Sequence, residues 1–214
     1  VSRMKHIAAI ILAAGSARRF GSNKLLEPLT LGESTMPMLA HSIKPWLQVF
    51  DRINIVVNVN SDALQKAVCQ ALPESVNQLR WLVCENANVG MGASLSYGVK
   101  ENVEADGWLI GLGDMPSVPV AVIREVKETL INGAMLAAPY YQKKRGHPVG
   151  LSASYRDELQ QFQHDSGAKE ILARDHVLIS RVTSDEAGIC VDIDTSEDLD
   201  SYQKQLHSDL KITH

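Results

Sequence analysis

Long apolar runs and paired cysteines are both missing from this sequence. No stretch of apolar residues approaches the length of a membrane span. The three cysteines, Cys69, Cys84 and Cys190, lie apart among apolar neighbours and form no Cys-x-x-Cys pair. This argues against a disulfide framework and favours reduced thiols in a cytoplasmic protein. Arg3 and Lys5 precede the first apolar run, but no small-residue cleavage site follows, so we expect no targeting signal.

An excess of positive charge is also missing. The formal net charge is -4 and the pI is near 6.0, which argues against a general nucleic-acid-binding protein. Internal repeats and low-complexity tracts are absent as well. The 214 residues show no shift in composition, and this length suits one sizeable α/β domain. We therefore expect residues 1–214 to form a single domain that binds small molecules.

What the sequence does contain is an apolar run, residues 7–12, that leads directly into a glycine-containing basic loop. Such a run of β-branched and small residues is typical of a strand buried on both faces of a parallel sheet. Gly15 and Gly21 would allow a sharp turn and close approach to a ligand. The cationic side chains of the loop are Arg18, Arg19 and Lys24. Because cations of this kind suit phosphate oxygens, we interpret the loop as a triphosphate site; the alternative is a surface turn with solvated charges.

Two better-known phosphate loops do not match this spacing. A P-loop needs four residues between its glycines and a Lys-Ser/Thr pair after the second, whereas five residues separate Gly15 from Gly21 and Leu25 follows Lys24. The dinucleotide fingerprint needs a glycine two residues after the first, and Ala17 stands there. Both motifs are excluded.

Predicted strands alternate with predicted helices along most of the chain. We expect strands at residues 7–12, 53–59, 81–84, 108–112, 135–138, 177–179 and 189–193, and helices at about 38–49, 61–72, 92–103 and 120–131, around 157 and 169, and at the carboxyl end. Pro45 is expected to kink or shorten the first of these helices. The alternation predicts a three-layer, Rossmann-like α/β fold with a mostly parallel (mixed) central sheet. Ligands of such folds collect at the carboxyl ends of the strands.

Acidic residues stand at two of those ends. Asp114 follows an apolar strand between Gly113 and Met115, and it could hold Mg²⁺ against a phosphate loop or cap the next turn. Asp192 and Asp194 are two residues apart, so on a strand their carboxylates would share one face, where a cation between them would be favourable. The alternative for Asp194 is an N-cap for the helix that begins near residue 196.

These segments together resemble the nucleotidyltransferases with a LAAG-type signature, and most closely the molybdenum cofactor cytidylyltransferases, which are related to the guanylyltransferases. The shared landmarks cover nearly the whole chain: Leu12-Ala13-Ala14-Gly15 with Arg19, Gly21 and Lys24; residues 90–95; residues 111–116; Gly146-His147-Pro148-Val149; Ser166-Gly167-Ala168-Lys169; and residues 192–199. Three positions depart from the usual pattern: Ala17, Asn23 and Ser196. None of these departures removes a charge that the chemistry needs.

The resemblance implies a role for each landmark. Leu12, Ala13, Ala14 and Gly15 would hold the nucleotide, Arg19 would meet the leaving pyrophosphate, and Lys24 would contact the phosphate being transferred. Asp114 and Asp194 would hold Mg²⁺ with Asp192 close by, so that Lys24, Arg19 and Asp114 are the implied catalytic residues. Gly90 and Ser94 would lie against the base or ribose, unless they form only a helix cap. Gly146, His147 and Pro148 would line the acceptor pocket, although a single histidine is more often structural.

The resemblance also implies an activity. A magnesium-dependent enzyme would transfer CMP from CTP to the terminal phosphate of a molybdopterin-type cofactor and release pyrophosphate. Ala14 stands where related guanylyltransferases carry a second glycine, which favours CTP over GTP. A molybdenum enzyme that accepts the product is a possible partner. The alternatives are transfer to a sugar or polyol phosphate, and a non-catalytic protein that binds nucleotide or cofactor for a molybdenum hydroxylase.

Overall fold

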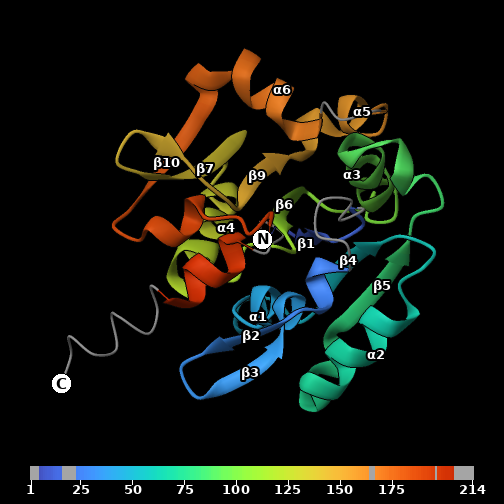
Figure 1. The fold of residues 1–214 in the computed structure, drawn as a ribbon. Coiled ribbons are helices and arrows are strands. Elements are labelled where there is room, and N and C mark those ends of the chain that lie inside the picture. Colours follow the sequence, from blue (N-terminus) through green and yellow to red (C-terminus); the bar gives the residue numbers. More distant parts are fainter. Residues whose placement is uncertain (1–4, 16–22, 164–166, 196, 205–214) are drawn as a thin grey trace.

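The computed structural model describes residues 5–15, 23–163, 167–195 and 197–204. Its centre is a sheet of eight strands in the order β10-β7-β9-β6-β1-β4-β5, with β8 paired to β7 (Figure 1). The strands are β1 (Ile7–Leu12), β4 (Ile53–Val57), β5 (Leu79–Val83), β6 (Gly107–Leu112), β7 (Leu136–Tyr141), β8 (Lys144–Arg145), β9 (Val149–Ser152) and β10 (Ile179–Ser184). The pairs β6-β1, β1-β4, β4-β5 and β10-β7 are parallel, and β9 is antiparallel to both of its neighbours. The predicted mostly parallel, mixed sheet is confirmed.

Helices cover both faces of the sheet and complete three layers. The α-helices are α1 (Met38–Ile43), α2 (Asp62–Ala71), α3 (Met91–Lys100), α4 (Val120–Ile131), α5 (Arg156–Leu159) and α6 (Gly167–Arg174). Buried apolar residues of α1, α2 and α4 form one core against the sheet, and those of α3, α5 and α6 form a second core on the other face. The central strands need apolar residues on both faces because two cores meet them, which explains the unbroken apolar run of β1. The three-layer, Rossmann-like fold is thereby confirmed.

A two-stranded hairpin interrupts the alternation after β1. It consists of β2 (Pro28–Leu31) and β3 (Ser34–Pro37), which pair antiparallel through a turn at Gly32 with a φ of 60°. The sequence analysis did not predict this hairpin. The helix expected at 38–49 ends at Ile43, and Pro45 then precedes a short 3₁₀ helix, η2 (Trp46–Gln48). Pro45 therefore shortens the helix, as predicted, because its ring blocks the regular backbone hydrogen bond.

Further 3₁₀ helices join the remaining elements. They are η1 (Lys24–Leu26), η3 (Pro73–Gln78), η4 (Ala87–Val89), η5 (Ala153–Tyr155), η6 (His176–Leu178) and η7 (Ala187–Cys190). Two of them correct the sequence analysis. The strand expected at 177–179 begins only at Ile179, and Val177, in η6, is 78% exposed. The strand expected at 189–193 is absent, since η7 occupies its first part.

Residues 187–195, which comprise η7 and the segment after it, do not pair with the sheet. Their backbone contacts include loops: the Ile189 carbonyl accepts a hydrogen bond from the His147 N–H, and the Ile193 N–H donates to the Asp114 carbonyl. Ile189 and Ile193 are fully buried. The apolar side chains of Ile189 and Ile193 are therefore explained by their packing in the core, and they do not belong to a strand. A helical segment, residues 197–204, comes next along the chain.

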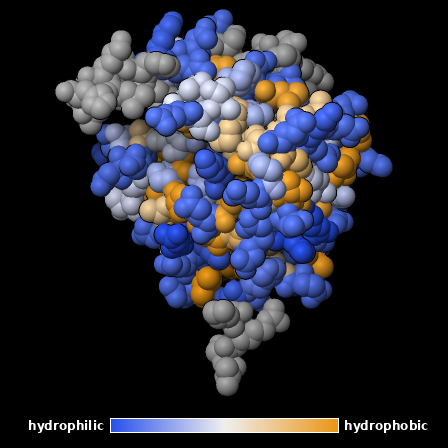
Figure 2. Space-filling view, turned by 90° about the horizontal axis from the view of Figure 1, so that it is seen from below, coloured by the Kyte–Doolittle hydropathy of each residue, from blue (hydrophilic) through white to orange (hydrophobic). Residues whose placement is uncertain are grey.

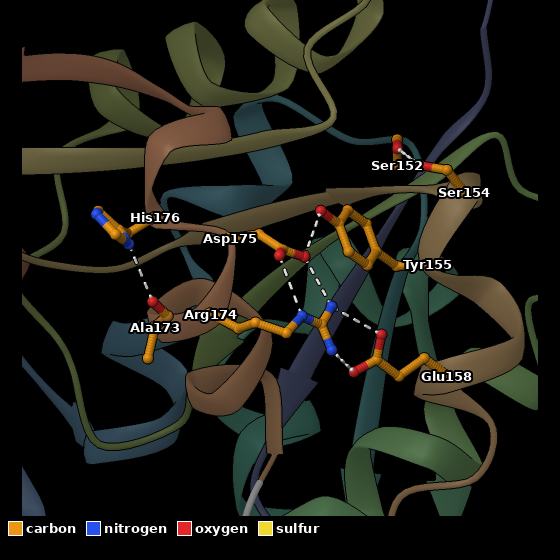
Figure 3. Close-up of polar contacts among 8 residues, drawn as sticks. All are labelled: Ser152, Ser154, Tyr155, Glu158, Ala173, Arg174, Asp175 and His176. Atoms are coloured by element: carbon orange, nitrogen blue, oxygen red, sulfur yellow. Dashed lines mark hydrogen bonds and ion pairs between the residues drawn. The ribbon is translucent and has the colours of Figure 1, made fainter.

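A polar network joins α5 to α6 on the surface, as Figure 3 shows. Arg174 at the end of α6 makes two hydrogen bonds to the Glu158 carboxylate and also contacts Asp175. Asp175 in turn accepts a hydrogen bond from the Tyr155 hydroxyl in η5. The paired donors of one guanidinium therefore connect three consecutive elements at the edge of the second core.

Polar side chains cover most of the face in Figure 2, where apolar residues occur in small groups among them. None of the helices in the described ranges combines the length and the apolar character that crossing a membrane requires. The helices on both faces pack against the same sheet. The expectation that residues 1–214 form a single domain stays a prediction.

Candidate functional site

The carboxyl ends of β1 and β6 lie side by side and form the floor of the site. The Gly113 N–H donates to the Leu12 carbonyl over 2.9 Å, so the two chains remain paired one residue beyond the strands. Asp114 comes next, and the buried Met115 follows it. Because the buried neighbours hold this turn in place, the Asp114 side chain is directed out of the sheet edge. The sequence analysis predicted this position from the rule for parallel sheets.

Lys24 is positioned by the short helix η1. The Asn23 side chain accepts a hydrogen bond from the Leu25 N–H, and the Glu27 N–H donates to the Lys24 carbonyl. Leu25 is buried in the first core and anchors the turn. Asn23, at one of the three positions that depart from the family pattern, is therefore the N-cap that begins this helix.

Asp194 lies in the segment that follows η7. The bond from the Ile193 N–H to the Asp114 carbonyl, 3.1 Å long, places it beside β6. The adjacent helical segment is capped by Thr195, whose hydroxyl accepts from the Asp198 N–H while the Asp198 carboxylate accepts from the Thr195 N–H. This reciprocal pair is a capping box. Among the described residues, Thr195 is thus the side-chain cap of this segment, and the Asp194 carboxylate accepts a hydrogen bond from Lys24.

The three charged groups meet at one nitrogen. The Lys24 Nζ lies 2.7 Å from Asp114 Oδ2 and 2.9 Å from Asp194 Oδ1. The Lys24 and Asp114 side chains are only 15% and 20% exposed, whereas that of Asp194 is 54% exposed. Burial lowers the pKa of Lys24, but the charge and hydrogen bond of Asp114, followed by those of Asp194, outweigh it and raise the pKa overall. Lys24 therefore stays charged throughout the physiological range.

Two carboxylates and one ammonium leave the site with a net negative charge. Among the described residues, no three His, Cys, Asp or Glu side chains gather as a ready-made metal cage. Mg²⁺ does not need one, because it is commonly held by one or two carboxylates together with waters and substrate phosphates. Two carboxylate oxygens that already share one cation fit this requirement. Asp114 and Asp194 are thus suited to a divalent ion by both chemistry and position.

Asp192 lies apart from this pair. The buried Ile193 separates it from Asp194, and Asp192 is exposed. Burial lowers the pKa of His147, and the charge of Asp192 opposes this decrease only in part. Since residues 191–195 do not form a strand, the argument that Asp192 and Asp194 share a strand face is wrong. The role of Asp192 as a metal ligand stays a prediction.

The segment expected to hold the nucleotide lies at the end of β1. Ala13 donates its N–H to the Val56 carbonyl, and the Ala14 carbonyl accepts from the Asn58 side chain, so the backbone is fixed by the neighbouring strand β4 and the residues after it. A Cβ added to Gly15 would meet no atom of the described residues within 4 Å, and its φ is not positive. Within the described part of the chain, no side chain therefore packs against Gly15. Arg18, Arg19 and Gly21 lie outside the described residues.

Gly90 and Ser94 stand at the start of α3. Gly90 has a φ of 148°, a conformation that side chains disfavour, and it is the N-cap residue of the helix. Ser94 is buried, and its hydroxyl hydrogen bonds to the Cys84 thiol. The structure thus explains both residues by local packing; contact with a base or ribose stays a prediction.

Gly146, His147 and Pro148 hold the segment that carries Asp194. A Cβ on Gly146 would lie 2.3 Å from the Ile189 carbonyl oxygen, so only glycine allows this close approach. The His147 Nδ1 is buried, and no described residue forms a hydrogen bond with it. Burial, then the charge of Arg145, lowers the pKa of His147 to about 4, against the opposing effects of the Ile110 backbone and Asp192. His147 is therefore neutral at physiological pH.

Sequence reasoning missed three polar contacts that shape the site: the Asn23 cap, the capping box and the Asn58 contact with Ala14. The Thr-x-x-Asp spacing of Thr195 and Asp198 is a recognisable signal for the second. The first is a local contact of a residue type that is preferred at N-caps. The third joins residues 44 positions apart and depends on tertiary placement.

Residues 9–179 match the model of the MobA-like NTP transferase domain. The chain belongs to this family. The match covers three parts of the site: the end of β1, Lys24 and Asp114. The nucleotidyltransferase prediction is therefore confirmed at the level of the family, without its nucleotide or acceptor.

This MobA-like transferase is also similar to individual proteins in sequence and in fold. The purine catabolism protein PucB of Bacillus subtilis (strain 168) is 29% identical in an alignment of 216 positions. The alignment covers 95% of this chain and 99% of PucB. The crystal structure of Rv0371c from Mycobacterium tuberculosis H37Rv superposes with a TM-score of 0.79 at 23% identity, covering 95% of this chain and 100% of that one. A second structure of Rv0371c, in complex with manganese, gives a TM-score of 0.74 at 22% identity over 96% of this chain and 100% of that one. These structural similarities show a shared fold.

Proposed function

We propose that this protein transfers CMP from CTP to the terminal phosphate of a molybdopterin-type cofactor in the cytoplasm, releases pyrophosphate and depends on Mg²⁺. The observation that carries the proposal is the meeting of Lys24 with Asp114 and Asp194 at the carboxyl end of the sheet. A cation-rich loop and a carboxylate pair are the parts that phosphoryl-type transfer needs, since the reaction requires positioning and charge neutralisation more than a covalent nucleophile.

The proposed step is a direct, in-line displacement. An oxygen of the acceptor phosphate forms a bond to the α-phosphorus of CTP, and the bond from that phosphorus to the bridging oxygen breaks, so that the electron pair leaves with pyrophosphate. The Lys24 ammonium would contact the transferred phosphate, and Arg19 would contact the departing pyrophosphate. A divalent ion held by Asp114 and Asp194 would supply further neutralisation of phosphate charge. That Rv0371c binds manganese supports a divalent ion here.

Ala14 is the basis for CTP in this proposal. Its side chain is buried and its carbonyl is held by Asn58, so the backbone at this position is fixed. Beside it, no atom of the described residues lies within 4 Å of a Cβ built on Gly15, which is compatible with a nucleotide there. In the acceptor part, the neutral His147 and the tightly packed Gly146 and Pro148 would form one wall.

Pyrophosphate release tests the proposal directly. The protein is incubated with Mg²⁺, with CTP, GTP or ATP, and with molybdopterin, a sugar phosphate or a polyol phosphate as acceptor. We expect the fastest release with CTP and molybdopterin. A preference for GTP would contradict the assignment of the base, and faster reaction with a sugar or polyol phosphate would favour the alternative acceptor class.

A non-catalytic role is the second candidate, favoured by the name of PucB, which states a pathway and no catalytic activity. Lys24→Ala separates the two. We expect the rate to fall at least about a hundredfold, the usual effect of losing a preorganised charge. Lys66, an exposed lysine of α2, provides the matched control, and Lys66→Ala should leave the rate unchanged. Equal rates for Lys24→Ala and the parent would refute catalysis at this site.

A further inference from the structure

Lys24 occupies the position that a metal ion would need. Its Nζ lies within hydrogen-bond distance of both carboxylate oxygens that are suited to a divalent ion. An Mg²⁺ ion lies about 2.0–2.1 Å from its oxygen ligands. An ion that close to both oxygens would be in contact with the ammonium, and two positive charges would then share one small space. The carboxylate pair can therefore hold the lysine or the metal, but not both in the present arrangement.

We propose that Lys24 is a resident counter-ion that excludes a free divalent ion from Asp114 and Asp194 and leaves them only when nucleotide phosphates offer it a new partner. This inference rests on the proposed function and deepens it, because it sets the order in which the site is filled. Free metal would bind weakly, and metal would enter together with the nucleotide.

The charges and the burial of the three residues support this exchange. With Lys24 in place, the two carboxylates and the ammonium carry one net negative charge, which a divalent ion would overcompensate; without the ammonium, the charge of the two carboxylates matches that of the ion. Lys24 and Asp114 are mostly buried, which strengthens their attraction, whereas Asp194 is more than half exposed and leaves an approach from solvent. A triphosphate carries enough negative charge to hold the displaced ammonium. The lysine side chain is long and flexible, so it can move between the two partners.

Binding of Mn²⁺ without nucleotide tests the exchange. Mn²⁺ prefers carboxylate and water ligands as Mg²⁺ does, and its binding can be followed by calorimetry and by electron paramagnetic resonance. The parent, Lys24→Met and Lys24→Gln are titrated together with two controls, Lys24→Arg and Lys66→Met. We expect both neutral variants to bind Mn²⁺ at least about tenfold more tightly than the parent, which corresponds to about 1.4 kcal/mol. Lys24→Arg, which retains the positive charge, and Lys66→Met should bind as weakly as the parent.

A double variant locates the ion. Adding Asp114→Asn to Lys24→Met should abolish the gain in Mn²⁺ affinity, because the carboxylate pair no longer exists. Circular dichroism confirms that each variant is folded before titration. If Lys24→Met unfolds without metal, Lys24→Gln, which can still donate hydrogen bonds to both carboxylates, gives the deciding result. Neutral variants that bind Mn²⁺ no more tightly than the parent would overturn the inference, as would a gain that survives Asp114→Asn.

Failure of this inference is distinguishable from failure of the proposed function. If the parent releases pyrophosphate from CTP but neutral variants gain no affinity for Mn²⁺, the exchange is wrong and the function stands. If the variants gain affinity but the parent releases no pyrophosphate from any nucleotide, the exchange stands and the function is wrong. A further readout is the effect of CTP, which should tighten Mn²⁺ binding more in the parent than in Lys24→Met.

Discussion

Replacing Gly146 by alanine would test how the segment that carries Asp194 is held. The added Cβ would lie 2.3 Å from the Ile189 carbonyl oxygen and 2.7 Å from Ile189 Cγ1, so the Ile189 backbone would have to move. Overpacking of this kind reduces stability by about 1–3 kcal/mol. The same movement would strain the hydrogen bond from the His147 N–H to the Ile189 carbonyl, which contributes about 1 kcal/mol. We therefore expect a loss of about 2–4 kcal/mol.

Thermal unfolding and Mn²⁺ binding measure the two consequences. For a chain of this size, the expected loss corresponds to a decrease in Tm of roughly 5–15 °C. Displacement of Ile189 should also move Asp194. The double variant Lys24→Met with Gly146→Ala should therefore bind Mn²⁺ more weakly than Lys24→Met alone. Gly15→Ala is the control, because its Cβ would meet no atom of the described residues within 4 Å. If Gly146→Ala were as stable as the parent, the packing of Gly146 against Ile189 would not hold the segment.

The remaining predictions concern pH, the nucleotide loop and the carboxyl-terminal helical segment. His147 has a pKa of about 4 in the folded protein and about 6.5 when unfolded, so the unfolded state binds more protons and stability falls with pH from about 6.5 towards 4. This group should reduce the free energy of unfolding by about 2 kcal/mol between pH 7.5 and pH 5, and denaturant titrations of His147→Gln should lack that decrease. Gly15→Ala should change Tm little but weaken CTP binding in calorimetry; unaltered binding would remove Gly15 from the nucleotide site. Tyr202→Phe removes the hydroxyl contact with Ser117 and should lower stability by about 1 kcal/mol in urea; an unchanged midpoint would mean that the contact contributes nothing.

The convergence of Lys24 and Asp114 could be predicted from the sequence because it follows from a general rule. Apolar runs predict parallel strands, and the residues that follow such strands meet at one edge of the sheet. The position of Asp194 could not be derived in the same way. The mostly apolar segment 189–193 has the composition of a strand. A strand needs a neighbouring strand as its hydrogen-bond partner, whereas this segment forms single backbone hydrogen bonds with His147 and Asp114.

Other differences have the same origin. The hairpin of β2 and β3 and the antiparallel strand β9 depend on pairing between segments, which local periodicity does not reveal. The role of Gly146 is visible only when Ile189 is placed against it. The resemblance assigned Gly146 and His147 to the acceptor pocket, which stays a prediction; the structure shows that both contact Ile189, in the chain segment that leads to Asp194.

The most direct test of the account is a crystal structure of the protein soaked with CTP and Mn²⁺, in which anomalous scattering locates the metal. We predict a manganese ion between Asp114 and Asp194, the triphosphate against the end of β1, and the Lys24 ammonium moved from the carboxylates to the phosphates. A manganese ion bound elsewhere, or a triphosphate that lies away from Lys24 and both aspartates, would contradict the claim that these three residues form one nucleotidyl-transfer site.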